Sequence, residues 1–147
     1  MTSDEQRFHD FVAARYGALL RTAYALTANH HDAEDLLQAS LVKAAAAWHR
    51  VGEQPEPYVR RILYHENISR WRRRRVDEHP TDVPPDRPAP GEPGSIDRVL
   101  VQRALARLTP KQRTVLVLRF LEDLTEQQTA ELMGVRPGTV KSQTRYA

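Results

Sequence analysis

The chain has 147 residues, a net charge of +3 and no cysteine, so it can form one ordinary domain or two small ones without disulfides, thiolate metal sites or a thiol nucleophile. The N-terminus lacks a signal peptide and no apolar run approaches the ~20 residues that span a bilayer, so we expect a cytoplasmic protein that contacts no membrane. Residues 1–75 carry twelve Lys and Arg against nine Asp and Glu, and residues 98–147 carry nine against four, which suits a polyanionic partner.

Apolar residues recur at helical spacing in the first half of the chain and predict three helices. The first covers about residues 3–26, the second about 29–51, and the third begins at Pro57 and reaches about 75. In the third helix the apolar stripe is interrupted by three polar residues, His65, Glu66 and Asn67. Polar groups therefore stand where a core helix would carry apolar ones.

Residues 76–95 hold six of the ten prolines and hardly an apolar side chain, which predicts an extended acidic linker. Beyond the linker, capping and turn residues predict four more helices: one after Ser95, one from Thr109 through Phe120, one from Thr125 to Gly134, and one from Pro137. No strand pattern appears. We therefore expect an all-α protein of two small helical domains, residues 1–75 and 96–147, joined by the linker.

Ala130, Gly134 and Val140 have the spacing of a helix-turn-helix. A small residue permits close helix approach, glycine can take φ > 0 in the turn, and valine buries the second helix. The outward face of the second helix then carries side chains suited to contacts with base edges and phosphates in a major groove: Arg136, Thr139, Lys141, Ser142 and Arg145. An ordinary αα-hairpin is the alternative interpretation.

The third helix ends in a basic run, Arg70 to Arg75, interleaved with Trp71. Guanidinium groups pair with phosphates, while Tyr64, His65 and Trp71 offer flat surfaces on which bases stack. Two alternatives stay open for the run alone: a solvated last turn that complements the helix dipole, and a polybasic membrane patch.

Three segments taken together resemble a known family. They are DAEDLLQASLVKAAAAW (32–48), PYVRRILYHENISRWRRRR (57–75) and ALARLTPKQRTVLVLRFLEDLTEQQTAELMGVRPGTVKSQ (104–143). In this order they are similar to the extracytoplasmic-function, or group IV, sigma factors of RNA polymerase, with the SigE-like subgroup as the nearest match. The resemblance covers nearly the whole chain.

The resemblance implies a non-catalytic initiation subunit that binds core RNA polymerase and promoter DNA and needs no cofactor. Residues 1–75 would be region 2, which binds the β′ clamp helices and melts the −10 element, and residues 96–147 would be region 4, which reads the −35 duplex and touches the β flap. The second helix would face β′ through Asp32, Glu34, Asp35, Gln38 and Lys43. The 52–57 loop and the third helix would hold the −10 strand through Gln54, Tyr58, Arg61, His65, Asn67, Ser69, Trp71 and Arg72. An anti-sigma factor is a further partner that the family suggests.

Two departures from the family pattern stand out. Arg136 replaces the Ser or Thr that usually caps the recognition helix, and the chain stops at Ala147 where relatives continue that helix, so we expect a truncated region 4. Two other functions remain as alternatives: a stand-alone helix-turn-helix regulator and a pure protein-interaction module. A metal site at His30, His31 and Asp32 is rejected because adjacent helical residues point in different directions. The sequence contains no Walker or Rossmann glycine loop. We therefore expect neither a bound metal nor an enzyme.

Overall fold

The computed structural model describes residues 3–76 and 96–146, and every regular element within them is helical. The elements are α1 (Ser3–Thr27), α2 (His30–Ala46), a 3₁₀ turn η1 (Trp48–Arg50), α3 (Pro55–Val76), α4 (Ile96–Ala106), α5 (Pro110–Leu116), a π-helical turn η2 (Val117–Leu121), α6 (Glu126–Met133) and α7 (Pro137–Tyr146). The all-α fold class is confirmed. Residues 77–95 of the expected linker lie outside the described residues. We call α1 to α3 the N-terminal unit and α4 to α7 the C-terminal unit.

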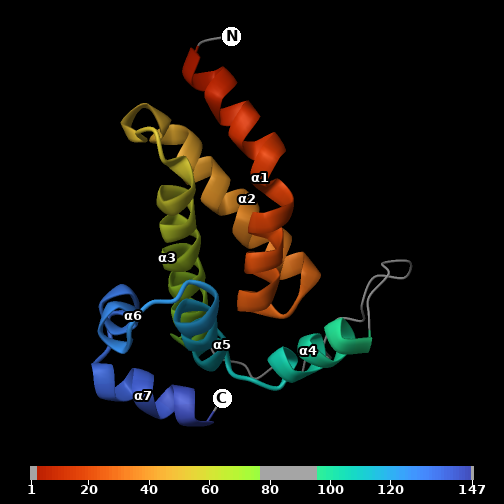
Figure 1. Ribbon diagram of the computed structural model, residues 1–147, viewed down its shortest axis with the longest axis vertical. Coiled ribbons are helices and arrows are strands. Elements are labelled where there is room, and N and C mark those ends of the chain that lie inside the picture. Colours follow the sequence, from red (N-terminus) through yellow and green to blue (C-terminus); the bar gives the residue numbers. More distant parts are fainter. Residues whose placement is uncertain (1–2, 77–95, 147) are drawn as a thin grey trace.

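In the N-terminal unit, α1, α2 and α3 pack together around an apolar core (Figure 1). Leu19 of α1, Leu36 of α2 and Leu63 of α3 are fully buried there. Burial of such a side chain contributes roughly 1.5–3 kcal/mol relative to exposure. At the start of α2, the Asn29 side chain accepts a hydrogen bond from the Asp32 N–H at 2.9 Å, which satisfies one of the free N–H groups of the first turn. The three predicted helices of this half are therefore present.

Two helix ends differ from the expectation. α2 ends at Ala46 rather than near Val51, because the chain tightens into the 3₁₀ turn η1 and buries Trp48. α3 begins at Pro55 rather than Pro57. Both prolines lie in the first turn of α3, where a missing N–H leaves no intrahelical hydrogen bond unmade, so the helix can start at the earlier one.

In the C-terminal unit, α5 and α6 begin at the two predicted capping boxes. Thr109 accepts from the Gln112 N–H at 3.2 Å and Gln112 accepts from the Thr109 N–H at 3.0 Å. Thr125 and Gln128 exchange the same pair of bonds at 3.0 and 2.9 Å. Between the boxes, α5 widens into η2 rather than continuing as a regular α-helix to its end. A π turn adds a residue to one helical turn and changes which side chains face inward.

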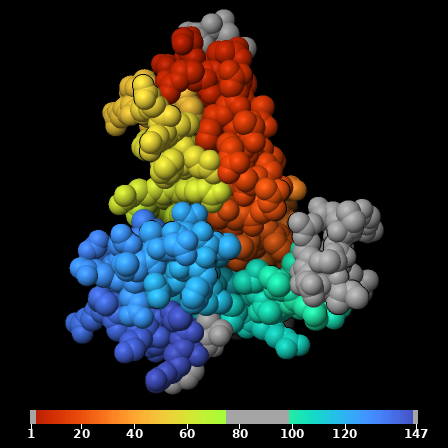
Figure 2. Space-filling view, in the orientation of Figure 1, coloured from red at the N-terminus to blue at the C-terminus, as the bar shows by residue number. Residues whose placement is uncertain are grey.

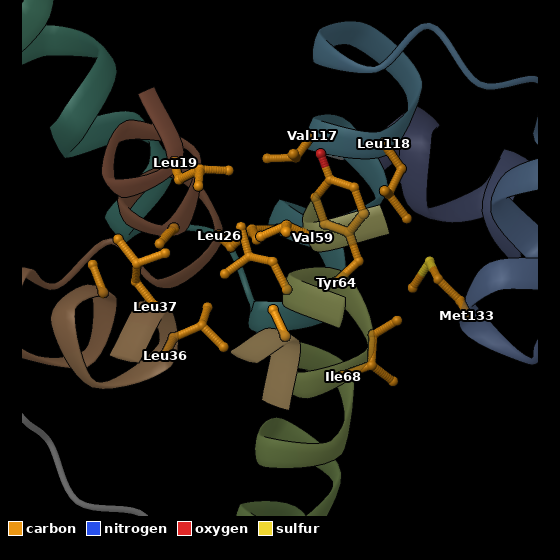
Figure 3. Close-up of a cluster of buried hydrophobic side chains, with 14 of the residues drawn as sticks. Leu19, Leu26, Leu36, Leu37, Val59, Tyr64, Ile68, Val117, Leu118 and Met133 are labelled. Carbon is orange, nitrogen blue, oxygen red and sulfur yellow. The ribbon is translucent and has the colours of Figure 1, made fainter. Parts of the chain in front are cut away.

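The two units are packed against each other. α5 lies against α1 and α3, and α6 lies against α3. Figure 2 shows the C-terminal unit seated on the lower end of the N-terminal unit, and Figure 3 shows side chains of both units in one cluster. From the N-terminal unit come Leu26, Tyr64 and Ile68, and from the C-terminal unit come Val117, Leu118 and Met133. The helix patterns predicted the buried stripe of each unit but not this contact.

Candidate nucleic-acid interface

α6 and α7 form a helix-turn-helix whose turn depends on Gly134. This glycine has φ 69°, and the following Val135 N–H donates to the Ala130 carbonyl at 3.0 Å, which closes α6. A residue with a Cβ is disfavoured at that φ by roughly 1–2 kcal/mol. Ala130 and Val140 are buried, so α7 packs on α6 through the small and apolar contacts that the spacing predicts. The helix-turn-helix geometry is therefore present.

The outer face of α7 is basic and open to solvent. Of the five predicted DNA contacts Thr139 is half-buried, and the exposed ones are Arg136, Lys141, Ser142 and Arg145. No Asp or Glu follows Gly134 in the sequence, so no acidic side chain of this segment opposes a phosphate. The DNA-binding role of these residues stays a prediction.

Arg136 caps α7 with its backbone alone. Its carbonyl accepts the N–H of Thr139 at 2.9 Å and of Val140 at 3.4 Å. The arginine side chain carries no acceptor that could bond a first-turn N–H, so the missing Ser or Thr is not replaced by the guanidinium. This leaves the Arg136 guanidinium exposed for another partner.

α3 carries an exposed polar stripe along its length. Going down the helix from the exposed Gln54, the predicted strand-binding residues on this stripe are Tyr58, Arg61, His65, Ser69 and Arg72. Tyr58 is half-buried and the others are exposed. Burial, and then the charge of Arg61, lowers the pKa of His65, which favours the neutral imidazole. A neutral flat ring is suited to stacking on a base.

Asn67 and Trp71 lie on a different face of α3, against the C-terminal unit. The Asn67 amide donates to the Thr114 hydroxyl at 3.0 Å, and both side chains are buried. Trp71 is half-buried against the shared core, and its Nε1–H is buried with no acceptor among the described residues. The Arg72 guanidinium, although exposed, donates to the Met133 carbonyl. The predicted strand-binding residues thus divide into an open set and a covered set.

Glu66 is a buried carboxylate held by three cations. Its side chain is 6% exposed and pairs with Lys43, with Arg70 at 3.3 Å and with Arg73 at 3.7 Å. The hydrogen bond from Lys43, which outweighs burial, lowers the pKa of Glu66, and Arg70 adds to the effect. Glu66 therefore fixes part of the basic end of α3, and it also engages Lys43, which the sequence assigned to polymerase contact.

The predicted polymerase-binding face of α2 is largely open. Glu34, Asp35 and Gln38 are exposed, while Asp32 is half-buried and pairs with Arg74 at 3.4 Å. Lys43 lies further along α2, paired with Glu66, rather than as an isolated charge. The acidic start of α2 thus presents carboxylates to solvent on the side away from Leu36 and Leu37, which are buried.

An open cavity of about 510 Å³ adjoins the loop before α3. It is lined by α1, η1 and the loop, with Asp10, Trp48, Gly52 and Glu53 among its walls. The family resemblance implied that the loop holds a base, but it did not point to Arg7, whose guanidinium donates to the Gly52 carbonyl at 3.2 Å. Arg7 precedes the loop by more than forty residues, and no sequence pattern connects the two.

The C-terminal unit also exposes two large apolar side chains at the end of η2. Phe120 is 60% exposed and Leu121 is 64% exposed. The predicted helix from Thr109 through Phe120 did not separate these residues from the buried ones, because the π turn shifts the face they occupy. They form a small exposed apolar pair at the end of η2.

Within residues 3–76 and 96–146, no set of three or more His, Asp or Glu side chains is placed to hold a metal ion. In the same residues no helix combines the length and the apolar composition that crossing a membrane requires.

The comparisons with known proteins agree with this arrangement. Residues 11–76 match Sigma-70 region 2, and residues 98–147 match Sigma-70, region 4. The RNA polymerase sigma-E factor of Streptomyces avermitilis is 37% identical over 138 residues, which cover 92% of this chain and 77% of that protein. The ECF RNA polymerase sigma factor SigM of Mycobacterium tuberculosis is 31% identical over 155 residues, covering all of this chain and 76% of SigM.

A solved structure is similar over almost the whole chain. The sigma factor RpoE of Bartonella quintana, crystallised with the anti-sigma factor NepR, has a TM-score of 0.69 and 27% sequence identity, over 96% of this chain and 91% of RpoE. The two matched regions and the helical arrangement define a promoter-recognition subunit of the sigma-70 type. The chain belongs to the extracytoplasmic-function family of RNA polymerase sigma factors.

Proposed function

We propose that this sigma factor divides promoter recognition between its two units, with α7 reading the −35 duplex and α3 melting and holding the −10 strand. The observation that carries the division is the difference between the two basic surfaces. The α7 face is a short basic helix surface without flat side chains in its predicted contact set, whereas α3 interleaves Arg61 with His65. Guanidinium and ammonium groups on a helix suit a major groove, and flat rings suit unstacked bases.

On the −10 side, the exposed stripe of α3 supplies Arg61 for phosphates and His65 and Tyr58 for bases, and Arg72 can join them once its guanidinium releases the Met133 carbonyl. The cavity beside the loop before α3, residues 52–54, is open and large enough for one base, and Arg7 of α1 holds that loop through a hydrogen bond to the Gly52 carbonyl. We assign the flipped base of the −10 element to this loop. Holding a flipped base costs a few kcal/mol of unstacking, which stacking at ~1–3 kcal/mol per base helps to offset.

For polymerase binding, the exposed carboxylates of α2 are assigned to the β′ clamp helices. The exposed Phe120 and Leu121 form an apolar patch that suits the β flap. An anti-sigma factor is included among the partners, since the structurally similar RpoE is crystallised with one. In this assignment the chain acts in the cytoplasm as a non-catalytic subunit, and the chemistry of RNA synthesis belongs to the core enzyme.

Run-off transcription with core polymerase and a pool of promoter fragments tests the proposal. Transcripts that require both the chain and core polymerase are expected. A parallel gel-shift assay without polymerase tests the alternative that the chain is a stand-alone regulator, which would bind its operator duplex unaided. Tight sequence-specific binding without polymerase, together with no transcript from any fragment, would rule out the proposed function.

A further inference from the structure

A second, smaller cavity lies where the two units meet. Its walls come from the end of α1, the start of α2, the last turns of α3 and the start of α5, and Figure 1 shows the lower end of α3 beside α5. The cavity has a volume of about 30 Å³ and is partly open to solvent. This is more than the roughly 10–15 Å³ that one water molecule needs, and far less than the ~300–1,000 Å³ of pockets for organic ligands. Its guest is therefore a water molecule or a small ionic group.

The lining of this cavity is strongly basic. Among its described residues, three carry guanidinium groups and one carries a carboxylate: Arg70, Arg74, Arg113 and Asp32. Asp32 pairs with Arg74 at 3.4 Å. Arg70 pairs at 3.3 Å with Glu66, which lies outside the lining and shares its carboxylate with two further cations. The positive charge around the cavity thus exceeds the negative charge, which favours an anion inside it.

Arg113 contributes a half-buried charge whose hydrogen-bond partners are neutral. Its Nε and Nη1 donate at 3.1, 3.2 and 2.6 Å to the backbone carbonyls of Leu26, Leu105 and Leu108. In the part of the chain that the structure describes, Arg113 pairs with no carboxylate. A guanidinium stays protonated in proteins, so this charge is not removed by loss of a proton. An anion beside it is stabilised, because opposite charges attract more strongly away from bulk water.

Trp71 adds a buried donor to the same lining. Its indole Nε1–H is buried with no acceptor among the described residues, which costs free energy. A water molecule satisfies such a donor but leaves the excess positive charge in place. An oxyanion does both, because it offers several acceptor oxygens together with negative charge.

We propose that this cavity binds a small phosphate-type oxyanion, which accepts hydrogen bonds from the three guanidinium groups and from the Trp71 indole. Planar guanidinium groups match the oxygens of a phosphate in pairs. Inorganic phosphate and the terminal phosphoryl group of a phosphomonoester share this chemistry. A phosphodiester within a DNA strand does not fit, because its two ester oxygens continue into sugars that a cavity of about 30 Å³ cannot enclose. The site therefore goes beyond promoter recognition, and its ligand is a free anion.

The two tryptophans give the test an internal control. Trp48 also has a buried indole N–H without an acceptor among the described residues, but it lines the cavity beside Gly52 and not this one. In the isotope-labelled full chain each indole N–H gives one resonance in a proton–nitrogen correlation spectrum, and Trp71→Phe identifies the resonance of Trp71. Inorganic phosphate is added in exchange for chloride at constant ionic strength. We expect a saturable shift of the Trp71 resonance and no shift of the Trp48 resonance.

Two variants change the charge of the lining in opposite directions. Arg74→Gln removes one cation, and the dissociation constant for phosphate should rise at least about fivefold because a charge-assisted hydrogen bond is lost. Asp32→Asn removes the carboxylate that repels the anion and occupies Arg74, so it should tighten binding. The matched control is Arg73→Gln, which removes the same charge from the same end of α3. Arg73 is 65% exposed and does not line the cavity, so its loss should change the dissociation constant by less than about twofold.

Two further probes distinguish the sources of the anion. If glycerol phosphate, a phosphomonoester, shifts the Trp71 resonance as inorganic phosphate does, the site takes a phosphoryl group through its open side. A shift with inorganic phosphate alone means that the whole anion is enclosed. Either result supports the proposal, whereas dimethyl phosphate, a phosphodiester, should produce no shift.

Four results would overturn the proposal. The first is the absence of a saturable Trp71 shift, which would leave the cavity to water. The others are equal shifts of both indole resonances, equal losses of affinity in Arg73→Gln and Arg74→Gln, and binding of dimethyl phosphate as tight as that of inorganic phosphate. Circular dichroism confirms that each variant is folded, and the opposite sign expected for Asp32→Asn keeps the test decisive if Arg74→Gln unfolds. None of these results depends on promoter recognition, which run-off transcription tests separately.

Discussion

Replacing Glu66 with Gln removes the negative charge that holds Lys43, Arg70 and Arg73, while it keeps the shape of the side chain. Hydrogen bonds to charged groups contribute about 1.5–3 kcal/mol, and breaking a fully buried pair costs about 3–5 kcal/mol. Lys43 and Arg73 are 60% and 65% exposed, so water can solvate them once the carboxylate is gone. We therefore expect Glu66→Gln to lower the free energy of unfolding by about 1.5–3 kcal/mol, or the melting temperature by roughly 5–10 °C.

The pH dependence of this loss identifies its cause. The folded protein lowers the pKa of Glu66 below its ordinary value of 4.5. The stabilisation is then fully present above pH 4.5 and is lost as the pH falls through the lower, folded pKa. Thermal unfolding of the unaltered chain and of Glu66→Gln should differ at pH 7 and converge in acid. Glu34→Gln, at an exposed acid of α2, is the control and should change little.

A difference of the same size at pH 7 and at pH 3 would mean that the carboxylate charge is not what stabilises the fold. Equal melting temperatures at pH 7 would refute the reasoning altogether. The three cations would then be held by contacts other than Glu66.

Further predictions concern the other surfaces. Binding to core polymerase, measured by pull-down, should weaken without loss of helical circular dichroism when four α2 residues are replaced together by Ala: Asp32, Glu34, Asp35 and Gln38. Unchanged affinity would remove this face from polymerase binding. Lys141→Ala and Arg145→Ala should each weaken −35 duplex binding. Where a phosphate contact is lost, the magnitude of the slope of log K against log salt should fall by about 1. An unaltered slope and affinity would place both residues outside the DNA contact. Gly134→Ala should lower the free energy of unfolding by roughly 1–2 kcal/mol because of its positive φ, and a neutral effect in urea unfolding would contradict that geometry.

Local patterns predicted most of the helices for physical reasons. Thr109 with Gln112 and Thr125 with Gln128 form capping boxes that need only neighbouring residues, so they could be identified in the sequence. The Gly134 turn likewise depends on one residue's conformational freedom. Spacing therefore sufficed to predict the helix-turn-helix and its exposed basic face.

Contacts between distant segments could not be predicted in this way. The sequence marked Asn67 as a polar interruption of an apolar stripe, but its partner Thr114 is 47 residues away, on the far side of the acidic segment. Arg7 and the Gly52 carbonyl are likewise separated by 45 residues. Side chains that bond across such distances leave no periodic signal, so the covered face of α3 and the braced loop emerge only from the tertiary structure.

The start of α3 shows a smaller limit of the same kind. Pro55 and Pro57 are both acceptable in a first helical turn, and no feature of the sequence favours one of them as the first residue of the helix. In the structure α3 begins at Pro55, after the 3₁₀ turn that buries Trp48.

The central claim is that α3 holds single-stranded −10 DNA while α7 reads duplex, and permanganate footprinting of −10 thymines in promoter complexes with core polymerase tests it most directly. His65→Ala and Trp71→Ala should retain −35 duplex binding but lose thymine reactivity, since each removes a surface offered to unstacked bases. Thermal unfolding of the same variants corrects for any loss of folded protein, which matters most for the half-buried Trp71. Normal thymine reactivity per folded molecule in both variants would contradict the claim and leave α3 as a structural helix only.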